Sequence, residues 1–278
     1  MHRLEFADVR DGWEQYVLLT GDRHHDSPKA DQKLEKQHLD LALERNAPII
    51  DIGDLFDAMQ GREDGRRNKE ESRPEHAEKE NYFDLLVDSA ESFFAPYAHL
   101  FAVLGIGNHE ASVSKYSGTD MTYRLARRLR ESWSGEWPYR GGYGGWLKLR
   151  FMLHNSKMQN MDLKYFHGSG GGGPVTKGVI QTNRRAVVYP NADIILSGHI
   201  HEGWIIVGAT QETINSQGTL GMRNQLHICV PSYKNDYGDG STGWAVERGM
   251  PPKPLGCAWL KLYYDRGQVR TQAFLDLG

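Results

Sequence analysis

The sequence predicts an α/β fold over the first two thirds of the chain and a mainly β C-terminal third. Three patterns support this. Short apolar runs stop abruptly at Gly and polar residues, stretches of helical periodicity separate them, and after residue 204 β-rich runs alternate with Gly, Asn and Pro. With 39% hydrophobic and 25% charged residues among 278, the chain is neither a disordered polymer nor a coiled coil. No run approaches the roughly 20 apolar residues that span a bilayer, so we expect a soluble protein.

The first βαβ unit occupies residues 16–54. Residues 16–20 (YVLLT) form an apolar run that ends at Gly21-Asp22, which predicts a buried strand opening onto a loop. An amphipathic helix is predicted over residues 31–46, where leucines lie among Glu, Lys and Gln. A second strand is predicted over residues 48–52 and ends at Gly53-Asp54.

The next elements continue the alternation after a highly charged segment. Residues 58–80 carry charges of both signs and almost nothing apolar, so we expect a solvated insertion there. A helix is predicted over residues 82–94, and a third buried strand over residues 100–104. That strand again ends in a polar segment, Gly-Ile-Gly-Asn-His-Glu at 105–110.

The rest of the chain shifts from helix to strand. A helix is predicted over residues 119–133, and the glycines of 141–145 (GGYGG) predict a flexible turn. Strands are then predicted over 146–153, 163–166, 192–196, 204–207, 226–230, 258–264 and 269–274. The last two strands are joined at Asp265-Arg266-Gly267, a hairpin signal. Because no linker interrupts the pattern, we expect one domain over residues 1–278.

Charge and cysteine content exclude several classes of protein. The formal net charge of −3 excludes the strongly positive field of a non-specific nucleic-acid binder. The two cysteines, Cys229 and Cys257, lie in apolar runs without CxxC spacing, so neither a zinc ribbon nor a disulfide scaffold is indicated. The polar, acidic segment 1–11 has no apolar core of a signal peptide, which predicts a cytoplasmic location.

Histidine carries the strongest functional signal. Six of the twelve histidines fall in short segments dense in Gly, Asp and Asn, and most of these segments follow predicted strands. The segments contain Asp22-Arg23-His24-His25, Gly53-Asp54-Leu55-Phe56-Asp57, Gly107-Asn108-His109-Glu110, His167-Gly168 and Gly198-His199-Ile200-His201. Loops at the ends of strands in an α/β sheet meet at one edge. Carboxylate, imidazole and amide ligands together suit divalent Mn, Fe or Zn, so these loops predict a metal site.

The order D-x-H, GD-x-x-D, GNH-E, H and GH-x-H resembles the calcineurin-like metallophosphoesterase superfamily. All five blocks are present over residues 15–205. A single block would be weak evidence, but the ordered set is strong evidence. The resemblance implies a four-layer αββα sandwich of two mixed β-sheets. It also implies two divalent metal ions, with Mn preferred and Fe, Zn, Ni or Mg as alternatives, that activate water for attack on phosphorus.

The resemblance assigns roles to residues position by position. Asp22, His24 and His201 correspond to ligands of one metal, Asp54 to the bridging carboxylate, and Asn108, His167 and His199 to ligands of the other. His109 corresponds to the catalytic histidine that protonates the leaving oxygen. Asp57 and Glu110 are expected to orient imidazoles from outside the ligand shell. His25 and Arg23 are expected to support the ligands or to face substrate.

The class of phosphoester remains open between several readings. The block GDLFD is similar to that of SbcD-type nucleases and lacks the Arg-Gly of protein phosphatases, and the layout resembles small phage and bacterial phosphoesterases. We expect a phosphodiesterase acting on nucleic acid (DNA or RNA) or nucleotides. The alternatives are a small-molecule phosphomonoesterase and a non-catalytic metal-binding scaffold. Arg124, Arg127, Arg128 and Arg130 fit either a nucleic-acid-binding face or an ordinary solvated helix face.

Overall fold

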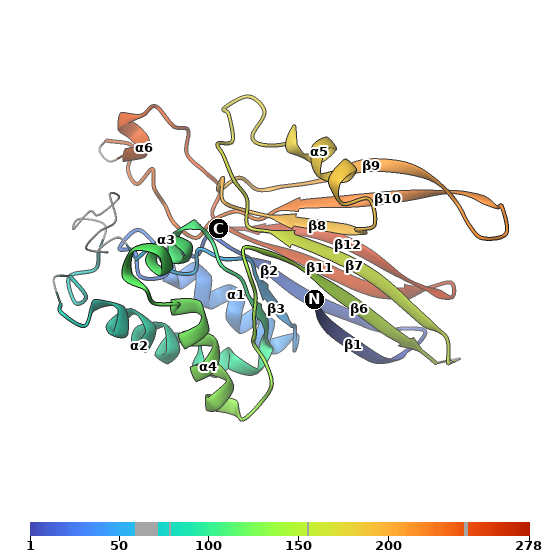
Figure 1. Cartoon of the computed structure of the whole chain (residues 1–278), viewed down its shortest axis with the longest axis horizontal. Coiled ribbons are helices and arrows are strands. Elements are labelled where there is room, and N and C mark those ends of the chain that lie inside the picture. Colours follow the sequence, from blue (N-terminus) through green and yellow to red (C-terminus); the bar gives the residue numbers. More distant parts are fainter. Residues whose placement is uncertain (59–71, 78, 155, 242–243) are drawn as a thin grey trace.

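Two six-stranded mixed sheets face each other at the centre of the molecule (Figure 1). The computed structural model describes residues 1–278 apart from 59–71, 78, 155 and 242–243. In spatial order, the strands of the first sheet are β1 His2–Val9, β6 Gly144–Leu153, β7 Met158–Phe166, β8 Ile194–Ser197, β10 Leu220–Cys229 and β9 Trp204–Ile214. Those of the second are β12 Gln268–Leu277, β11 Gly256–Asp265, β2 Glu14–Thr20, β3 Ile49–Asp51, β4 Phe101–Leu104 and β5 Tyr139–Arg140.

Helices cover the outer faces and complete the four layers. The second sheet is covered by α1 Gln32–Glu44, α2 Tyr82–Phe94, α3 Asn108–Ser117 and α4 Met121–Trp133, with a 3₁₀ helix at Ala95–Leu100. The first sheet carries α5 Gln181–Val188 against β9, and α6 Trp244–Glu247 lies in the loop before β11. The αββα sandwich of two mixed sheets is therefore confirmed. No helix in the described part of the chain is long and apolar enough to cross a membrane.

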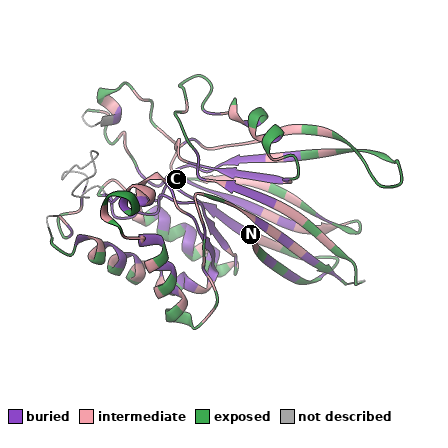
Figure 2. Ribbon diagram, in the orientation of Figure 1, coloured by how far each residue is buried: buried purple, intermediate pink, exposed green. Residues whose placement is uncertain are grey.

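The central strands contain long apolar runs because both of their faces are buried. In β2, Val17 and Leu19 pack into the core between the two sheets, whereas Leu18 packs against the helices. Ile49 and Ile50 of β3 divide between the same two cores. Successive side chains of a strand point to opposite faces, so a strand buried on both faces is apolar at most of its positions. Figure 2 shows the resulting band of buried central strands.

Local signals fix the helix starts. Asp31 caps α1 by accepting a hydrogen bond from the backbone N–H of Leu34 at 2.9 Å, and Asp120 caps α4 by accepting one from Tyr123. Leu125, Ala126 and other residues on one face of α4 are buried. Most predicted elements are present, but β9 extends to Ile214 and β10 begins at Leu220, well beyond the predicted 204–207 and 226–230.

Several elements have no counterpart in the sequence predictions, among them the short β5 and α6 as well as β1, α3 and α5. β1 was missed because it is an edge strand whose polar residues alternate with buried Leu4 and Phe6. α3 was missed because its first turn is the Asn108–Glu110 motif, and α5 because only part of one face is buried. Most of the charged insertion, expected over 58–80, lies outside the described residues, namely 59–71 and 78.

Candidate active site

The five motif loops meet at one edge of the sandwich, as predicted, and backbone hydrogen bonds join them. The N–H of Asp22 donates to the carbonyl of Gly53 at 2.9 Å, which joins the loops after β2 and β3. The N–H of Gly198 donates to the carbonyl of His167 at 2.8 Å, which joins the loops after β8 and β7. The carbonyl of Asp54 accepts a hydrogen bond from the N–H of His24 at 2.9 Å. The loops therefore hold one another in place.

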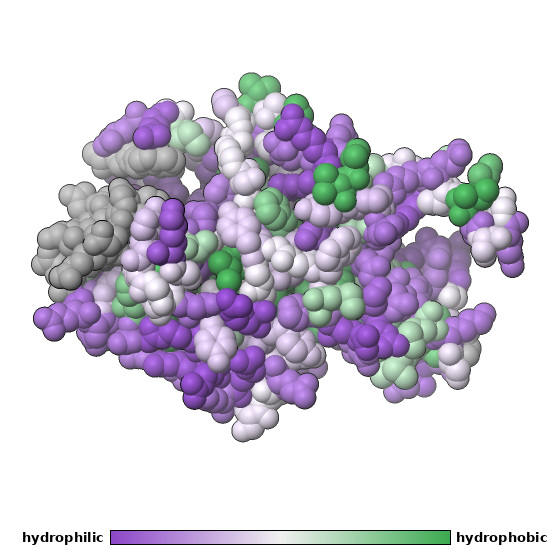
Figure 3. Space-filling model, viewed as in Figure 1, coloured by the Kyte–Doolittle hydropathy of each residue, from purple (hydrophilic) through white to green (hydrophobic). Residues whose placement is uncertain are grey.

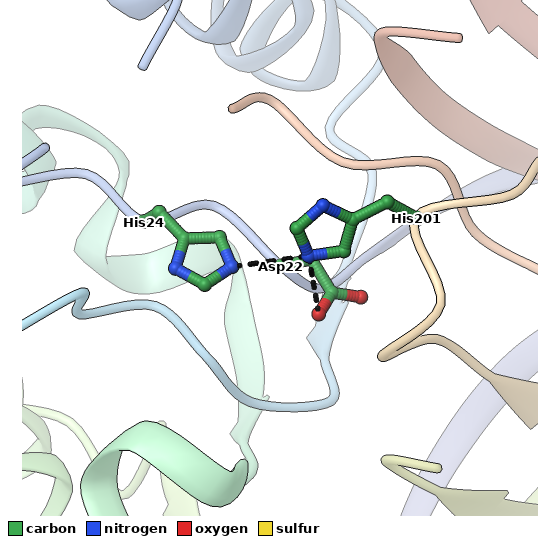
Figure 4. A group of neighbouring side chains, drawn as sticks. All are labelled: Asp22, His24 and His201. Carbon is green, nitrogen blue, oxygen red and sulfur yellow. Dashed lines mark hydrogen bonds and ion pairs between the residues drawn. The ribbon is translucent and has the colours of Figure 1, made fainter. Parts of the chain in front are cut away.

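Asp22, His24 and His201 form the first group of potential ligands (Figure 4). Their potential ligand atoms all lie within 4.8 Å of one another. The Nε2 atoms of the two histidines face each other at 3.3 Å, and Oδ1 of Asp22 lies 3.5 Å from Nε2 of His201. Residues separated by 177 positions in the chain thus present their donor atoms to one point.

Asp54, His167 and His199 form a second such group, and Asn108 joins it. Nε2 of His167 lies 3.2 Å from Oδ2 of Asp54 and 3.3 Å from Oδ1 of Asn108. Nδ1 of His199 lies 2.7 Å from the same amide oxygen. All seven residues that the sequence proposed as ligands therefore lie in these two groups.

The donor atoms fit divalent cations. Within the described residues, the buried Oδ1 of Asp22 has no hydrogen-bond partner, which is unfavourable unless a cation contacts it. It lies 3.9 Å from Nε2 of His167, so it faces the second group as well as the first. Nδ1 of His24 contacts Asp57 at 2.8 Å, so Nε2 is the nitrogen presented toward His201. Imidazole, carboxylate and amide oxygen are donors for Mn, Fe or Zn.

Five of these seven residues have left-handed backbone conformations. The φ angles are +50° for Asp22, +46° for His24, +52° for Asp54, +73° for His199 and +54° for His201. Non-glycine residues are uncommon in this region, and Asp, Asn and His are enriched among those that adopt it. Such conformations cluster at functional sites, where the surrounding structure stabilises them.

Two motif glycines are required by close approach rather than by turn geometry alone. A Cβ at Gly198 would collide with Oδ2 of Asp22, and one at Gly107 would collide with the carboxylate of Asp54. The same Oδ2 of Asp22 accepts a hydrogen bond from the N–H of His199 at 2.7 Å. The glycines thus leave room for the two carboxylates.

Carboxylates and imidazoles at the site shift one another's pKa values. Burial opposes a charge on His167, yet Asp54 and Asp22 raise its pKa to about 10. Burial also opposes a charge on Asp54, but His167 and His109 hold the pKa of that carboxyl well below its usual range. Burial and the nearby charge of Asp54 raise the pKa of Glu110 to about 8. Bound cations would compensate the same carboxylates that now raise the pKa of His167.

His109 and Asp57 are brought together beside the first group. Nδ1 of His109 lies 2.6 Å from the carbonyl oxygen of Asp57, and its ring packs edge-on against that of His24 at 4.8 Å. The carboxylate of Asp57 contacts Nδ1 of His24 at 2.8 Å, the arrangement that orients a ligating imidazole. His109 also lies in the first turn of α3, where the helix end favours a phosphate.

Glu110 makes different contacts from those expected. Its buried carboxylate accepts hydrogen bonds from the backbone N–H groups of Asp54, Phe56 and Gly107, at 3.0, 2.9 and 2.8 Å. The hydrogen bonds described for it therefore hold the loop after β3 rather than an imidazole.

His25 and Arg23 point into the protein instead of toward substrate. His25 is 2% exposed, contacts Glu35 at 2.8 Å and packs against Phe93 and Phe94. Arg23 is fully buried and makes ion pairs with Glu35 and with Asp51. The expectation that either residue faces substrate is not supported, whereas a supporting role for the D-x-H loop is.

Three further residues reach the site without having been singled out from the sequence. The carboxylate of Asp26 accepts hydrogen bonds from the N–H groups of Asp57 and Ala58 at 2.6 and 2.9 Å. Lys234 contacts Asp57, and Asp236 contacts His201. Asp26 was detectable from its place directly after the D-x-H block, but nothing in the local sequence distinguishes Lys234 or Asp236.

Three of the four arginines of α4 pair with carboxylates, and Arg130 donates a hydrogen bond to the carbonyl of Pro138. Arg124 pairs with Asp84 and Arg128 with Asp88 of α2, and Arg127 pairs with Glu131 on α4 itself. These contacts neutralise the charges that a nucleic-acid-binding face would need, so they favour the reading of an ordinary solvated helix face.

Comparisons with known proteins identify the family of the chain. A family model described as calcineurin-like phosphoesterase matches residues 16–203. None of the curated proteins matches the sequence. Similar solved structures include Vacuolar Protein Sorting 29 from Cryptosporidium parvum, with 9% identity, a TM-score of 0.39, and coverage of 96% of this chain and 100% of that one. Calcineurin-like phosphoesterase YfkN from Bacillus subtilis has 15% identity, a TM-score of 0.38, and coverage of 95% and 90%.

A metallophosphoesterase from Sphaerobacter thermophilus has 13% identity, a TM-score of 0.36, and coverage of 94% and 88%. Because these structural likenesses are remote, the assignment rests on the family match, which spans more than half of the chain and contains all five motif blocks. The chain belongs to the calcineurin-like phosphoesterase family, whose members are metal-dependent hydrolases of phosphoesters.

Proposed function

We propose that the protein is a phosphodiesterase with a dinuclear metal centre, acting on nucleic acid or nucleotides. The observation that carries the proposal is the pairing of two ligand groups at one sheet edge, Asp22/His24/His201 and Asp54/His167/His199, with Asn108 in the second. Asp54 is the bridging carboxylate in this proposal. The mixed oxygen and nitrogen donors of both groups suit Mn, Fe or Zn, and Mn is the metal of this proposal.

The residues of the chain have separate tasks in the reaction. The bound cations would supply positive charge for the phosphate oxygens and an activated water. His109, oriented by the carbonyl of Asp57 at 2.6 Å, donates a proton to the leaving oxygen. Glu110 fixes the loop that carries Asp54, and Asp57 fixes the ring of His24. The N-terminus of α3 contributes a favourable dipole for the phosphate.

The charges at the site favour a diester substrate over a monoester substrate. A monoester brings a second negative charge, which cationic side chains would help the bound cations to compensate. Two cationic side chains described near the ligand groups, Arg23 and Lys234, are already engaged by carboxylates. Their positive charge is therefore neutralised within the protein, which favours the singly charged diester.

The test compares substrates on metal-stripped protein reloaded with Mn. We expect faster hydrolysis of bis-p-nitrophenyl phosphate than of p-nitrophenyl phosphate. His109→Ala should reduce turnover about 10²- to 10⁴-fold on a dinucleotide, whose alkoxide leaving group needs a proton. The loss should be smaller on bis-p-nitrophenyl phosphate, because p-nitrophenolate leaves readily without protonation. His154→Ala, at an exposed histidine after β6, is the matched control.

Each other outcome selects an alternative. Preference for the monoester would assign the chain to small-molecule phosphatases. Two bound metals without turnover on either ester would favour a metal-binding scaffold. Equal losses on both leaving groups would remove the acid role of His109. DNA, RNA and cyclic nucleotides are the next substrates if the diester is preferred.

A further inference from the structure

Lys234 lies between two carboxylates at the edge of the first ligand group. Its Nζ atom is 3.1 and 3.2 Å from the two oxygens of Asp57 and 3.4 Å from Oδ1 of Asp236. The side chain of Lys234 is only 9% exposed, and that of Asp57 is fully buried. A lysine in such a place needs partners, because burial of an unpaired ammonium is unfavourable.

Each of the two carboxylates also contacts a different histidine of that group. Asp57 lies 2.8 Å from Nδ1 of His24, and Asp236 lies 3.6 Å from Nδ1 of His201. The Nε2 atoms of the same two rings face each other at 3.3 Å. Lys234 therefore closes a chain of contacts that runs from one imidazole to the other on the side away from their Nε2 atoms.

The backbone around Lys234 is held against the loop after β2. Oγ of Ser232 donates to the carbonyl of Asp22 at 2.8 Å, and the N–H of Tyr233 donates to the same carbonyl at 3.1 Å. The N–H of Lys234 donates to Oγ of Ser232 at 2.9 Å, and Lys234 forms an isolated β-bridge with Ala30. The ammonium is thus carried on a segment whose position is fixed relative to Asp22.

We propose that Lys234 is a positioning residue for the first ligand group, which it aligns by tying the carboxylate behind His24 to the carboxylate behind His201. The residue lies outside the 16–203 match that defines the family, so the family motifs do not include it. The inference rests on the proposed function only in that this group binds a metal ion.

Two effects of Lys234 on metal affinity have opposite signs. As a positive charge near the site, it repels a cation, so its removal alone would tighten metal binding. As a link between the two carboxylates, it orients both rings, so its removal would weaken binding. The sign of the change therefore separates a positioning role from a purely electrostatic one.

The experiment measures Mn²⁺ binding to the full-length, metal-stripped protein by calorimetry and electron paramagnetic resonance, without substrate. His201→Ala identifies the binding step that belongs to the first group, and Asn108→Ala identifies the other step. Lys234→Met should weaken the first step about 10- to 100-fold and leave the second unchanged. Lys234→Arg, which keeps the charge and can contact two carboxylates, should recover most of the affinity.

Lys253→Met is the matched control, because Lys253 is a similarly buried lysine that pairs with Glu202, next to His201. It should leave both steps unchanged. Tighter binding, no change, or equal weakening of both steps in Lys234→Met would overturn the proposal. If that variant does not fold, Asp236→Asn at a 25% exposed side chain must weaken the first step alone, and an unchanged first step overturns the proposal.

Since no substrate is present, the result is independent of turnover. Selective loss of the first step in a protein that hydrolyses no ester would refute the proposed function and retain the role of Lys234. Full activity on diesters with unaltered Mn²⁺ binding in Lys234→Met would do the reverse.

Discussion

Replacement of Arg23 by Met tests whether the D-x-H loop is held by a buried ion-pair network. The guanidinium of Arg23 is fully buried, with Nε 2.6 Å from Asp51 and Nη1 2.8 Å from Glu35. It also lies 5.5 Å from the ring centroid of Phe94 and 5.4 Å from that of Tyr233. Methionine is a side chain of similar length that fits among these aromatic rings, but it leaves two carboxylates without their cation.

The expected loss of stability follows from the two carboxylates that remain buried without their cation. Removal of one partner from a buried ion pair costs about 3–5 kcal/mol of unfolding free energy, a large share of the roughly 5–15 kcal/mol of a typical domain. Urea unfolding at pH 7 with a chelator present measures it without a metal contribution. The deficit should shrink as the pH falls, because protonation neutralises the carboxylates of Glu35 and Asp51 in the variant.

Arg127→Met is the control, since Arg127 is exposed and pairs with Glu131 one helical turn away, and surface ion pairs contribute little to stability. If Arg23→Met costs as little as this surface control, the buried network does not stabilise the loop. A deficit that grows toward low pH would equally refute the reasoning, because the orphaned carboxylates would not be its source.

Two further variants test packing at the site and proton linkage away from it. Gly198→Ala should weaken Mn²⁺ binding in calorimetry, because the added Cβ collides with Oδ2 of Asp22. Gly171→Ala is the control, because its added Cβ meets nothing within 4 Å. Burial, aided by Arg185, lowers the pKa of His227 to about 4. The unfolded chain therefore binds a proton that the folded chain does not, and stability falls by up to about 3 kcal/mol from pH 6.5 to pH 4. Urea unfolding should show a smaller decrease in His227→Gln, and parallel pH profiles would contradict this.

The sequence predicted the framework of the fold because its strands are apolar on both faces. Runs such as 16–20 are recognisable only because two cores, one on each side of β2, exclude polar residues. Edge strand β1 has one polar face, so its residues did not stand out. The glycines of 141–145 predicted a flexible turn, but Gly145 lies within β6, where a Cβ would overlap the ring of Tyr165.

The site was predictable where ligands sit in short blocks at strand ends. The contacts that organise those blocks were not, because they join distant segments. Glu110 binds the backbone N–H groups of Asp54 and Phe56, which no spacing rule links to it, whereas its bond to Gly107 has the N-cap-to-N3 spacing of a capping box. Arg124 and Arg128 of α4 gave no sign of their partners, because Asp84 and Asp88 lie some 40 residues earlier on α2. The single domain over 1–278, the cytoplasmic location and the identity of the metal stay predictions.

The position of the last strands has a consequence for how this chain can be divided. The family match ends at residue 203, but β11 joins β12 to β2, and β10 joins β9 to β8. A fragment cut at that boundary would leave the open sides of β2 and β8 unpaired, and it would lose Ser232 and Tyr233, which bind the carbonyl of Asp22. The segment that defines membership of the family is therefore shorter than the segment that must fold together. Comparisons of catalytic power between relatives should accordingly include the strands that follow the last motif.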